Sequence, residues 1–539
     1  MATIAEMTIG TAGRQLIETD VKIKNKDDVI KVLQDTFMDH LKNVERMVYL
    51  INYEHGEQPL QRKKKQREEI DIKAIDNIAN EINDFKISYQ WSMPILYKQR
   101  GDIDIAKNDS NADDNGIAQI NEMLQSENSF AEDLKLAYYV ECCGLGYQFV
   151  DVKRDWEDGK SLFDLLTLSP LCTYIVHDNS IYHRPVLGVT YRRLQNGTTY
   201  YTCWTNDTRY EIRNLVEEVN GQKTETWGET SRNNEKNPLG KIPIVEFVHA
   251  SDRMGAWERQ IPDMDNLNIL SSDYTNQVAQ NTQAIWWGND ITFPEDEKGN
   301  IKTPKSGGWI LTYSDDTGKS NSVNIKPLVI ETDYNGQLQN LQYRREIIKQ
   351  KCSVPNQQSL GGGSTGTAMS MSSGWQNAEI AAANEEQYTR ASKRKIAELI
   401  LRAIKISPDL QDKRSPLLTL KLSDIDVSIL RNRSYDLITK ANAYATFVSH
   451  GVSGRHTLEL IEAFPDPTQV YLDSKETIDA YQKSLTESKD TGEGRNMADL
   501  SDQISNSPFA NSSKTGDGQK TVNKLQDDKQ PDSNRTAEK

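Results

Sequence analysis

Apolar side chains recur at three- and four-residue spacing in several stretches of the chain, and this spacing predicts amphipathic helices. The first covers residues 27–53, where Asp27 or Asp28 can cap the N-terminus. Its apolar positions are Leu33, Phe37, Leu41, Val44 and Val48. A second stretch, 70–97, is predicted to be helical and then extended from Pro94 to Tyr97.

Between residues 132 and 250 the pattern changes to short runs rich in Tyr, Val, Ile and Thr, separated by turn residues. A short helix that ends at Cys143 and Gly144 precedes them. Such runs are typical of strands, so this region is expected to be a strand-rich α+β domain. The predicted strands are 147–152, 173–177, 185–193, 198–204, 210–212 and 242–249.

Two further helices flank a small β segment. The apolar stripe of residues 261–288 consists of Met264, Leu267, Leu270, Tyr274, Val278 and Ile285. Residues 289–332 contain turn signals at 298–300 and 307–308, which indicate short strands. A helix over 333–352 follows. We expect these two helices to carry the small β module away from the main body.

The segment from Cys352 to Ala378 has no charged side chain, whereas the chain as a whole is 27% charged. At that proportion about seven of its residues would carry a charge. Its glycines and hydroxyl residues are typical of a flexible loop. A long helix, 376–406, is predicted next, with Pro408 at its end and with an apolar face of Ile396, Leu399, Ile400, Ala403 and Ile404.

Residues 435–486 are predicted to be helical again. Gly451 interrupts this region, Ser453 can cap the next helix, and Pro465 and Pro467 stop it. From about residue 487 onward the chain is polar, with Phe509 as its single aromatic residue. That composition is typical of disorder.

Composition narrows the class of protein. The 539 residues are 36% hydrophobic, and 64 basic against 79 acidic side chains give a net charge of −15. The mean hydropathy of −0.70 and the pI near 5.2 are unlike those of proteins that coat nucleic acid, which carry net positive charge. No apolar run is long enough to span a membrane, and residues 1–10 lack a secretory pattern. The five cysteines include the adjacent pair Cys142 and Cys143, so reduced thiols in a cytoplasm are expected.

The sequence contains no catalytic or metal-binding spacing that we recognise. The seven histidines do not form HExxH or paired Cys/His motifs, so neither a catalytic residue nor a metal ligand is predicted. His177–Asp178 could act as a general base, but a turn after a strand is the favoured interpretation. The run Gly361–Thr367 lacks the lysine of a phosphate-binding loop. A basic cluster at 62–67 favours a solvated loop, with a phosphate contact as the alternative.

Several stretches resemble, in their order along the chain, the portal proteins of tailed bacteriophages, in the group typical of long-tailed phages of Gram-positive hosts. Ser88 and Thr365 replace a family Gly and Ser, and the segments 107–116 and 218–236 are larger than usual. The module at 289–332 matches weakly. The similar stretches are 49–56, 77–95, 144–147, 169–180, 237–247 with Trp257–Glu258, 352–368 and 437–464.

This resemblance implies an α+β portal fold with a strand-rich wing, a two-helix stem, a small β clip, a tunnel loop, a long helix, a helical crown and a disordered C-terminal tail. The implied boundaries are 1–26 for an N-terminal arm, 27–260 for the wing, 261–288 and 333–355 for the stem helices, 289–332 for the clip, 356–375 for the tunnel loop, 376–434 for the wing and spine helix, 435–486 for the crown and 487–539 for the tail.

The resemblance also implies a function. Such proteins form a twelve-subunit ring at one capsid vertex, through which double-stranded DNA is packaged and ejected. The implied partners are the terminase large subunit, then the head–tail adaptor, and the major capsid and scaffolding proteins; no cofactor and no membrane are implied. The ring would be a virion component assembled in the host cytoplasm. The expected DNA-channel residues are Asn356, Gln357, Gln358, Ser364 and Thr365; Gly361, Gly362, Gly363 and Gly366 would give the loop freedom; and Lys298, Lys302 and Lys305 would contact the clip's partner.

Two other function classes compete with the portal. A packaging enzyme, either a motor ATPase or a nuclease, is disfavoured because the phosphate-binding lysine and an acidic metal constellation are missing. A soluble scaffold with an acidic surface remains the third possibility. A closed ring with an open axis would separate the portal from that scaffold.

Overall fold

The computed structural model describes residues 13–60, 70–100, 116–153, 161–219, 222–229, 235–282, 285–291, 308–312, 324–328, 333–356, 374–407, 416–431 and 437–461, with single positions from 464 to 480. The chain divides into two units, 1–473 and 474–539, and every element below belongs to the first. Mixed helices and strands confirm the α+β prediction.

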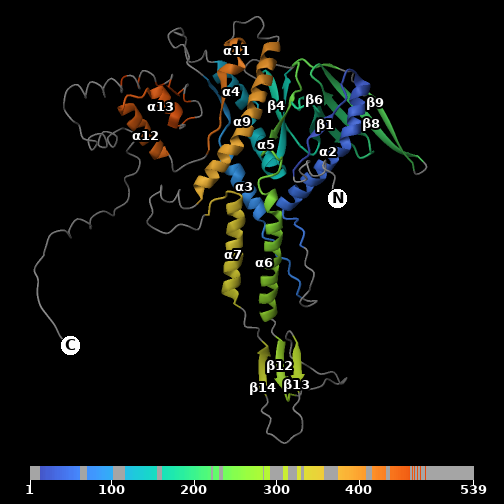
Figure 1. The fold of residues 1–539 in the computed structure, drawn as a ribbon, viewed down its shortest axis with the longest axis vertical. Coiled ribbons are helices and arrows are strands. Elements are labelled where there is room, and N and C mark those ends of the chain that lie inside the picture. Colours follow the sequence, from blue (N-terminus) through green and yellow to red (C-terminus); the bar gives the residue numbers. More distant parts are fainter. Residues whose placement is uncertain are drawn as a thin grey trace, which may run out of the picture. The chain divides into compact units, whose positions relative to one another are not determined.

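A seven-stranded sheet forms one part of the structure (Figure 1). The helix α2 (Lys26–Glu54) packs on one face of this sheet, where its Val29, Val32 and Leu33 share a core with Tyr174 and Tyr201. The strand order is β1 (Ile17–Thr19), β5 (Thr173–Asp178), β6 (Pro185–Arg193), β7 (Thr199–Trp204), β8 (Thr208–Val219) and β10 (Glu235–Lys236), and β9 (Gln222–Glu229) also pairs with β8.

The N-terminus of α2 differs from the prediction. Asn25 is the capping residue, because its side chain accepts a hydrogen bond from the Asp28 amide at 3.0 Å. Asp28 is the third helical residue and its carboxylate accepts from the Asn25 amide at 3.2 Å. This reciprocal pair is a capping box, in which the residue one turn before the acid is the cap. The predicted Asp27 or Asp28 cap is therefore wrong by two or three positions.

A second core lies where the three-stranded sheet β11–β3–β4 meets the helices α5 and α9. Val140, Phe163, Phe247 and Ile400 are among its buried residues. The elements of this part are α3 (Ile78–Gln90), β2 (Leu96–Gln99), α4 (Gly116–Ser126), α5 (Ser129–Cys143), β3 (Leu145–Val152), β4 (Phe163–Leu168), β11 (Ile244–Val248), α9 (Trp375–Ile406), α11 (Pro416–Thr419), the 3-10 turn Leu422–Asp424 and β15 (Ile425–Ser428), which pairs with β2.

Most predicted elements of the strand-rich region are confirmed, and β6 has the predicted bounds. The helix α5 ends at Cys143 because Gly144 adopts a positive φ of 80°. The prediction was wrong for β8, which extends well beyond 210–212, and it did not include β1, β4, β9 or β10. The charged residues of β8 and β9 hid these strands, because two antiparallel strands can pair through their backbones whatever their side chains are.

The next segment consists of a 3-10 turn (Glu258–Gln260), α6 (Ile261–Thr282) and α7 (Tyr334–Lys351), with a three-stranded sheet between the two helices in sequence. Its strands are β12 (Ile285–Asn289), β13 (Trp309–Thr312) and β14 (Asn324–Leu328). Ile285 therefore begins a strand, and its predicted place on the helical stripe is wrong. Trp286 stacks on Trp309 across β12 and β13, with ring centroids 5.9 Å apart, which favours the strand.

Two shorter helices, α12 (Leu437–Ser449) and α13 (Gly454–Ile461), follow. Gly451 separates them as predicted, with a φ of +88° that favours glycine. Within the described residues, no helix combines the length and the apolar character that crossing a bilayer requires.

Candidate functional site

The uncharged segment is the candidate site, and the structure describes its two ends. Asn356 is described and exposed. The other predicted channel residues, Gln357, Gln358, Ser364 and Thr365, and the glycines at 361–363 and 366 lie outside the described residues. So do Lys298, Lys302 and Lys305, the basic cluster at 62–67, the polar loop before Gly116 and the tail after 487.

The two described ends of this segment meet. A Cβ atom added to Gly374 would lie 3.8 Å from the Cα of Pro355. Ser353 has a φ of +59° and Gly374 a φ of +84°, so both turns are sharp. The Val354 amide also donates a hydrogen bond back to the Lys349 carbonyl at 2.9 Å. Pro355 and Gly374 therefore lie close together, and we call this pair the base of the segment.

Each side of this base is held by apolar packing. On the side of α7, Cys352 is buried with Ile348 in a core that also contains Trp257. On the side of α9, Trp375 packs against Phe85 and Tyr89, with ring centroids 6.0 and 5.7 Å away. Burying aromatic rings of this size fixes the position of a helix terminus. Packing therefore holds the base of the segment on both sides.

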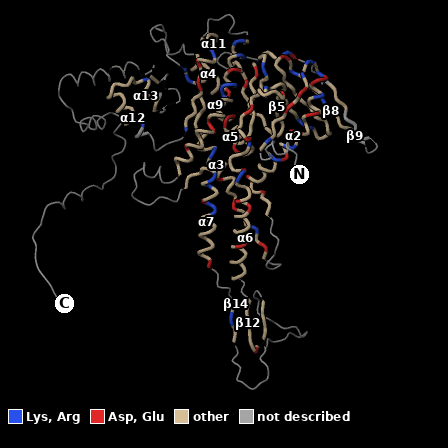
Figure 2. The backbone as a smooth tube through the Cα atoms, viewed as in Figure 1, with Lys and Arg blue, Asp and Glu red and all other residues tan. Residues whose placement is uncertain are grey.

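Carboxylates at the start of α9 add a second set of anchors. Glu379 accepts a hydrogen bond from the Tyr89 hydroxyl at 2.5 Å and pairs with Arg431. Glu386 pairs with the same arginine and with Arg390 at 2.5 Å. Figure 2 shows acidic and basic residues interspersed through this part of the structure. The Tyr89 hydroxyl therefore fastens α9 to α3, and the charge pairs with Arg431 fasten it to the chain after β15.

A buried charge cluster lies beneath these anchors. Glu141 on α5 is 3.3 Å from Nδ1 of His249, and Glu385 on α9 accepts a hydrogen bond from Lys86 at 2.8 Å. Burial alone would lower the pKa of His249, but the carboxylates of Glu141 and Glu385 raise it overall. Burial likewise opposes the charge of Glu141, yet His249 and Lys86 hold the pKa of its carboxyl below the ordinary value. The cluster therefore favours a protonated His249.

The same cluster has the residue types of a metal site. One ligand atom each from Glu141, His249 and Glu385 lie within 4.8 Å of one another. However, the Lys86 ammonium already bonds to Glu385, and a protonated His249 adds a second positive charge. Two cations opposite two carboxylates balance the charge, so these residues favour an ion-pair network over a divalent cation.

A second buried ion pair fixes the middle of α9. The Lys393 ammonium lies 2.5 Å from Asp133 on α5 and 3.1 Å from the side-chain oxygen of Gln148 on β3. It also lies 5.6 Å from the ring centroid of Phe247. All four groups belong to different elements, so this lysine ties the long helix to both layers of the second core.

The buried face of α6 is apolar at Met264 and Leu267 and polar from Asn268 onward. Asn276 donates to the Ile72 carbonyl and accepts from the Ile72 amide, both at 2.8 Å. One turn earlier Ser272 bonds to the backbone of Ala74, and Asn268 accepts from the Asp76 amide at 2.8 Å. We call residues 72–76 the strap. The strap lies along α6, and the side chains of α6 hydrogen-bond to the backbone of the strap.

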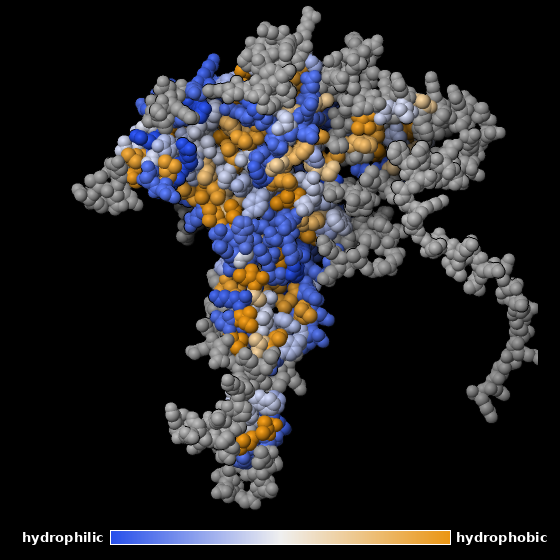
Figure 3. Space-filling model, turned by 180° about the vertical axis from the view of Figure 1, so that it is seen from behind, coloured by the Kyte–Doolittle hydropathy of each residue, from blue (hydrophilic) through white to orange (hydrophobic). Residues whose placement is uncertain are grey.

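Part of the apolar stripe of α6 faces outward as a result. Leu270 and Val278 are 38% and 39% exposed, although both belong to the predicted stripe. On α7, Leu338 and Tyr343 are also exposed. Figure 3 shows hydrophobic atoms among hydrophilic ones on the surface that these helices form. A single subunit leaves this apolar surface in water, which is typical of an interface.

His177 and Asp178 are the last two residues of β5, and a turn follows them. The Asp178 carboxylate accepts hydrogen bonds from the Ser180 hydroxyl and the Arg184 amide, both at 2.8 Å. The interpretation as a turn after a strand is confirmed.

The sequence pattern does not predict the buried network of Glu141, His249, Glu385 and Lys86, nor the strap. The available signal was weak: Glu385, Ser392 and Lys393 lie near the apolar face of α9 at helical spacing. Charged residues at such positions are usually solvated, so only the partners on other elements reveal the network.

The described residues thus hold the two ends of the neutral segment close together at Pro355 and Gly374. The helices α6 and α7 leave apolar side chains exposed. A family model described as phage portal protein, SPP1 Gp6-like, matches residues 27–487. The protein is therefore of the phage portal class, the head–tail connectors that work as ring oligomers within the virion. Within this class, the chain belongs to the SPP1 Gp6-like family.

Two of the solved structures that are similar to this chain come from gene transfer agent particles. One, from the neck of an empty particle computed with C6 symmetry, has 10% identity and a TM-score of 0.37, and covers 72% of this chain and 90% of that chain. Another, from the virion of a native particle, has 12% identity and a TM-score of 0.35, with 77% and 92% covered. No curated protein matches the chain.

Proposed function

We propose that the uncharged segment surrounds the DNA in the channel of the portal ring. The observation that carries this proposal is the narrow base at Pro355 and Gly374, which lies within a run of 27 consecutive uncharged residues, 352–378. Trp375 and Cys352 anchor the base by packing. The residues between them would then be available to contact DNA.

The neutral composition suits a polymer that must slide. Double-stranded DNA carries one charge per about 1.7 Å of its axis, and each lysine–phosphate contact releases counterions and holds the strand. Amide and hydroxyl groups such as those of Asn356, Gln357 and Ser364 can touch phosphates without this grip. The net charge of −15 further disfavours adhesion.

We propose that α6 and α7 form the stem and that β12, β13 and β14 form the clip. Neighbouring stems would cover Leu270, Val278 and Tyr343 in a ring of twelve. The clip, with Lys298, Lys302 and Lys305, would meet the terminase large subunit during packaging and the head–tail adaptor afterwards. Major capsid and scaffolding proteins would surround the ring as it assembles in the host cytoplasm. The remaining assignments, wing, crown and C-terminal tail, follow the same family pattern.

The test places two lysines in the segment, Gln357→Lys with Gln358→Lys. The variant should still form rings, but DNA translocation at low salt should fall strongly and recover at high salt through screening. The matched control is Gln125→Lys with Ser126→Lys, which adds the same charge at exposed positions on α4. Normal packaging by the first variant at low salt would contradict the channel assignment. If the variant did not form rings, we would assign the segment to a subunit interface instead.

We also propose that the protein has no enzymatic activity of its own. The run Gly361–Thr367 lacks a phosphate-binding lysine, and the buried carboxylates of Glu141 and Glu385 are paired with cations. Purified rings should therefore neither hydrolyse ATP nor cut DNA. ATP turnover that a single substitution abolishes would overturn this and favour the packaging enzyme.

A further inference from the structure

The outward face of α2 carries exposed apolar side chains beside charged ones such as Lys42, which pairs with Asp39. Met38 is 62% exposed, and Leu41 and Val48 on the same face are also exposed. Asp35 and Glu45 lie among them, and neither carboxylate has an ion-pair partner among the described residues. Exposed apolar groups that cluster on one helix face are typical of a protein interface.

The opposite face of the same sheet carries a complementary row. Tyr191, Tyr201 and Ile212 point toward α2, and side chains alternate along a strand. Arg192, Tyr200 and Arg213 therefore point away from α2. They stand side by side, because Arg192 pairs with Tyr200 and Tyr200 with Arg213 in the strand register.

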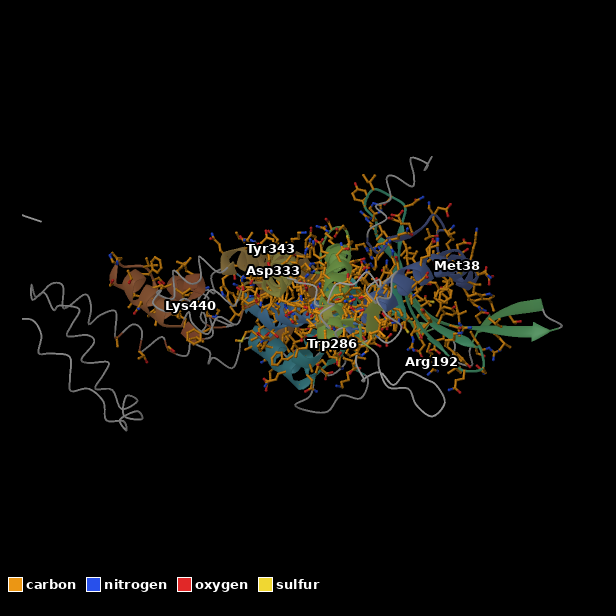
Figure 4. All side chains as sticks on the ribbon, turned by 90° about the horizontal axis from the view of Figure 1, so that it is seen from below. Met38, Arg192, Trp286, Asp333, Tyr343 and Lys440 are labelled. Carbon is orange, nitrogen blue, oxygen red and sulfur yellow. The ribbon has the colours of Figure 1, made fainter. Side chains whose placement is uncertain are left out.

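Both surfaces belong to one packed unit of helix and sheet. Figure 4 labels Met38 and Arg192 on opposite sides of that unit. A ring with cyclic symmetry needs this arrangement, because each subunit must offer one surface to the subunit before it and a different surface to the subunit after it. The family's ring assembly supplies the occupant, which is a second copy of this chain.

We propose that the outward face of α2 in one subunit docks on the Arg192–Tyr200–Arg213 row of the next. Asp35 and Glu45 would meet the two arginines. Met38 and Leu41 would pack on the ring of Tyr200, over which Arg192 already lies at 5.3 Å. The proposal rests on the portal function, and it specifies which surfaces of the wing close the ring.

Thiol crosslinking in assembled rings tests the contact. The double variant Met38→Cys with Tyr200→Cys is made in a Cys172→Ser background, because Cys172 is the exposed native thiol. The sheet and a helix about 10 Å across separate the two positions within one subunit, so a short bis-maleimide can join them only between subunits. We expect a covalent ladder from dimer to closed ring, and no ladder from either single variant.

Three results would overturn the proposal. Intact rings by native mass spectrometry without a ladder would mean that this contact is wrong while the portal function stands. Covalent dimers from Met38→Cys alone would mean that α2 packs on α2. Absence of rings from the unsubstituted protein would instead refute the proposed function.

A second pair of variants does not depend on crosslinking. Met38→Glu with Val48→Glu should lower the fraction of protein in rings at least tenfold while the monomer keeps its circular dichroism spectrum. The control is Ile181→Glu, an 86% exposed residue in the turn between β5 and β6 that belongs to neither surface. Equal loss of rings in both variants would contradict the assignment.

Discussion

The bond between the strap and α6 can be broken by one substitution. Asn276 is fully buried, and its amide makes both hydrogen bonds of the Ile72 backbone to α6. Asn276→Ala removes both bonds and leaves the rest of the strap, including the bonds of Ser272 and Asn268, in place.

The expected loss of free energy follows from the Ile72 amide and carbonyl, which both lose their partner in this variant. A buried donor or acceptor that loses its partner costs about 1–3 kcal/mol. The Ile72 side chain is 42% exposed, so water can reach this end of the strap and the lower limit applies to each group. Two groups at about 1 kcal/mol each give about 2 kcal/mol in the free energy of local opening. Because 1.4 kcal/mol is tenfold, we expect the Ile72 amide to exchange about 30-fold faster.

Hydrogen–deuterium exchange on assembled rings measures this opening directly. The Ile72 amide should show the full increase, and the Ala74 amide, which donates to Ser272 at 3.0 Å, a smaller one. The control is Thr275→Ala, which removes a hydrogen bond within α6 and none to the strap. Unchanged exchange at Ile72, or an equal increase across α6 and α9, would refute the reasoning.

The remaining predictions concern buried charges. Replacing Lys393 with Met strands the Asp133 carboxylate and should lower the free energy of unfolding by about 3–5 kcal/mol in denaturant titrations, with recovery when Asp133→Asn is added. The folded protein raises the pKa of His249, so the contribution of His249 to the free energy of unfolding is complete below the unfolded pKa of about 6.5. This contribution is lost as the pH rises through the folded pKa. The variant His249→Gln should remove this alkaline loss in thermal melts. Burial lowers the pKa of His40 to about 4, and a hydrogen bond with the Leu171 backbone opposes this more weakly. The free energy of unfolding should therefore fall by about 3 kcal/mol as the pH drops from 6.5 to 4. The variant His40→Gln should abolish that loss.

Local patterns in the sequence determined much of the fold. The apolar face of α9, from Ile396 to Ile404, is buried as predicted, since a helix with one continuous apolar stripe can bury it in only one way. The strands β5, β6 and β7 were found from their Tyr, Val and Thr content. The uncharged segment needed no structure at all, because the absence of charge is a property of the sequence.

The tertiary structure decided which polar residues are inside. Asn268, Ser272 and Asn276 share the buried face of α6, and the predicted apolar stripe is partly exposed at Leu270 and Val278. Hydrophobic periodicity could not show this, since the partner of Asn276 lies 204 residues away in the strap. The same holds for the buried charges of Lys393 and Glu385, whose partners Asp133 and Lys86 lie on other helices. A buried polar group is stable only beside its partner, and the folding of distant segments alone brings the two together.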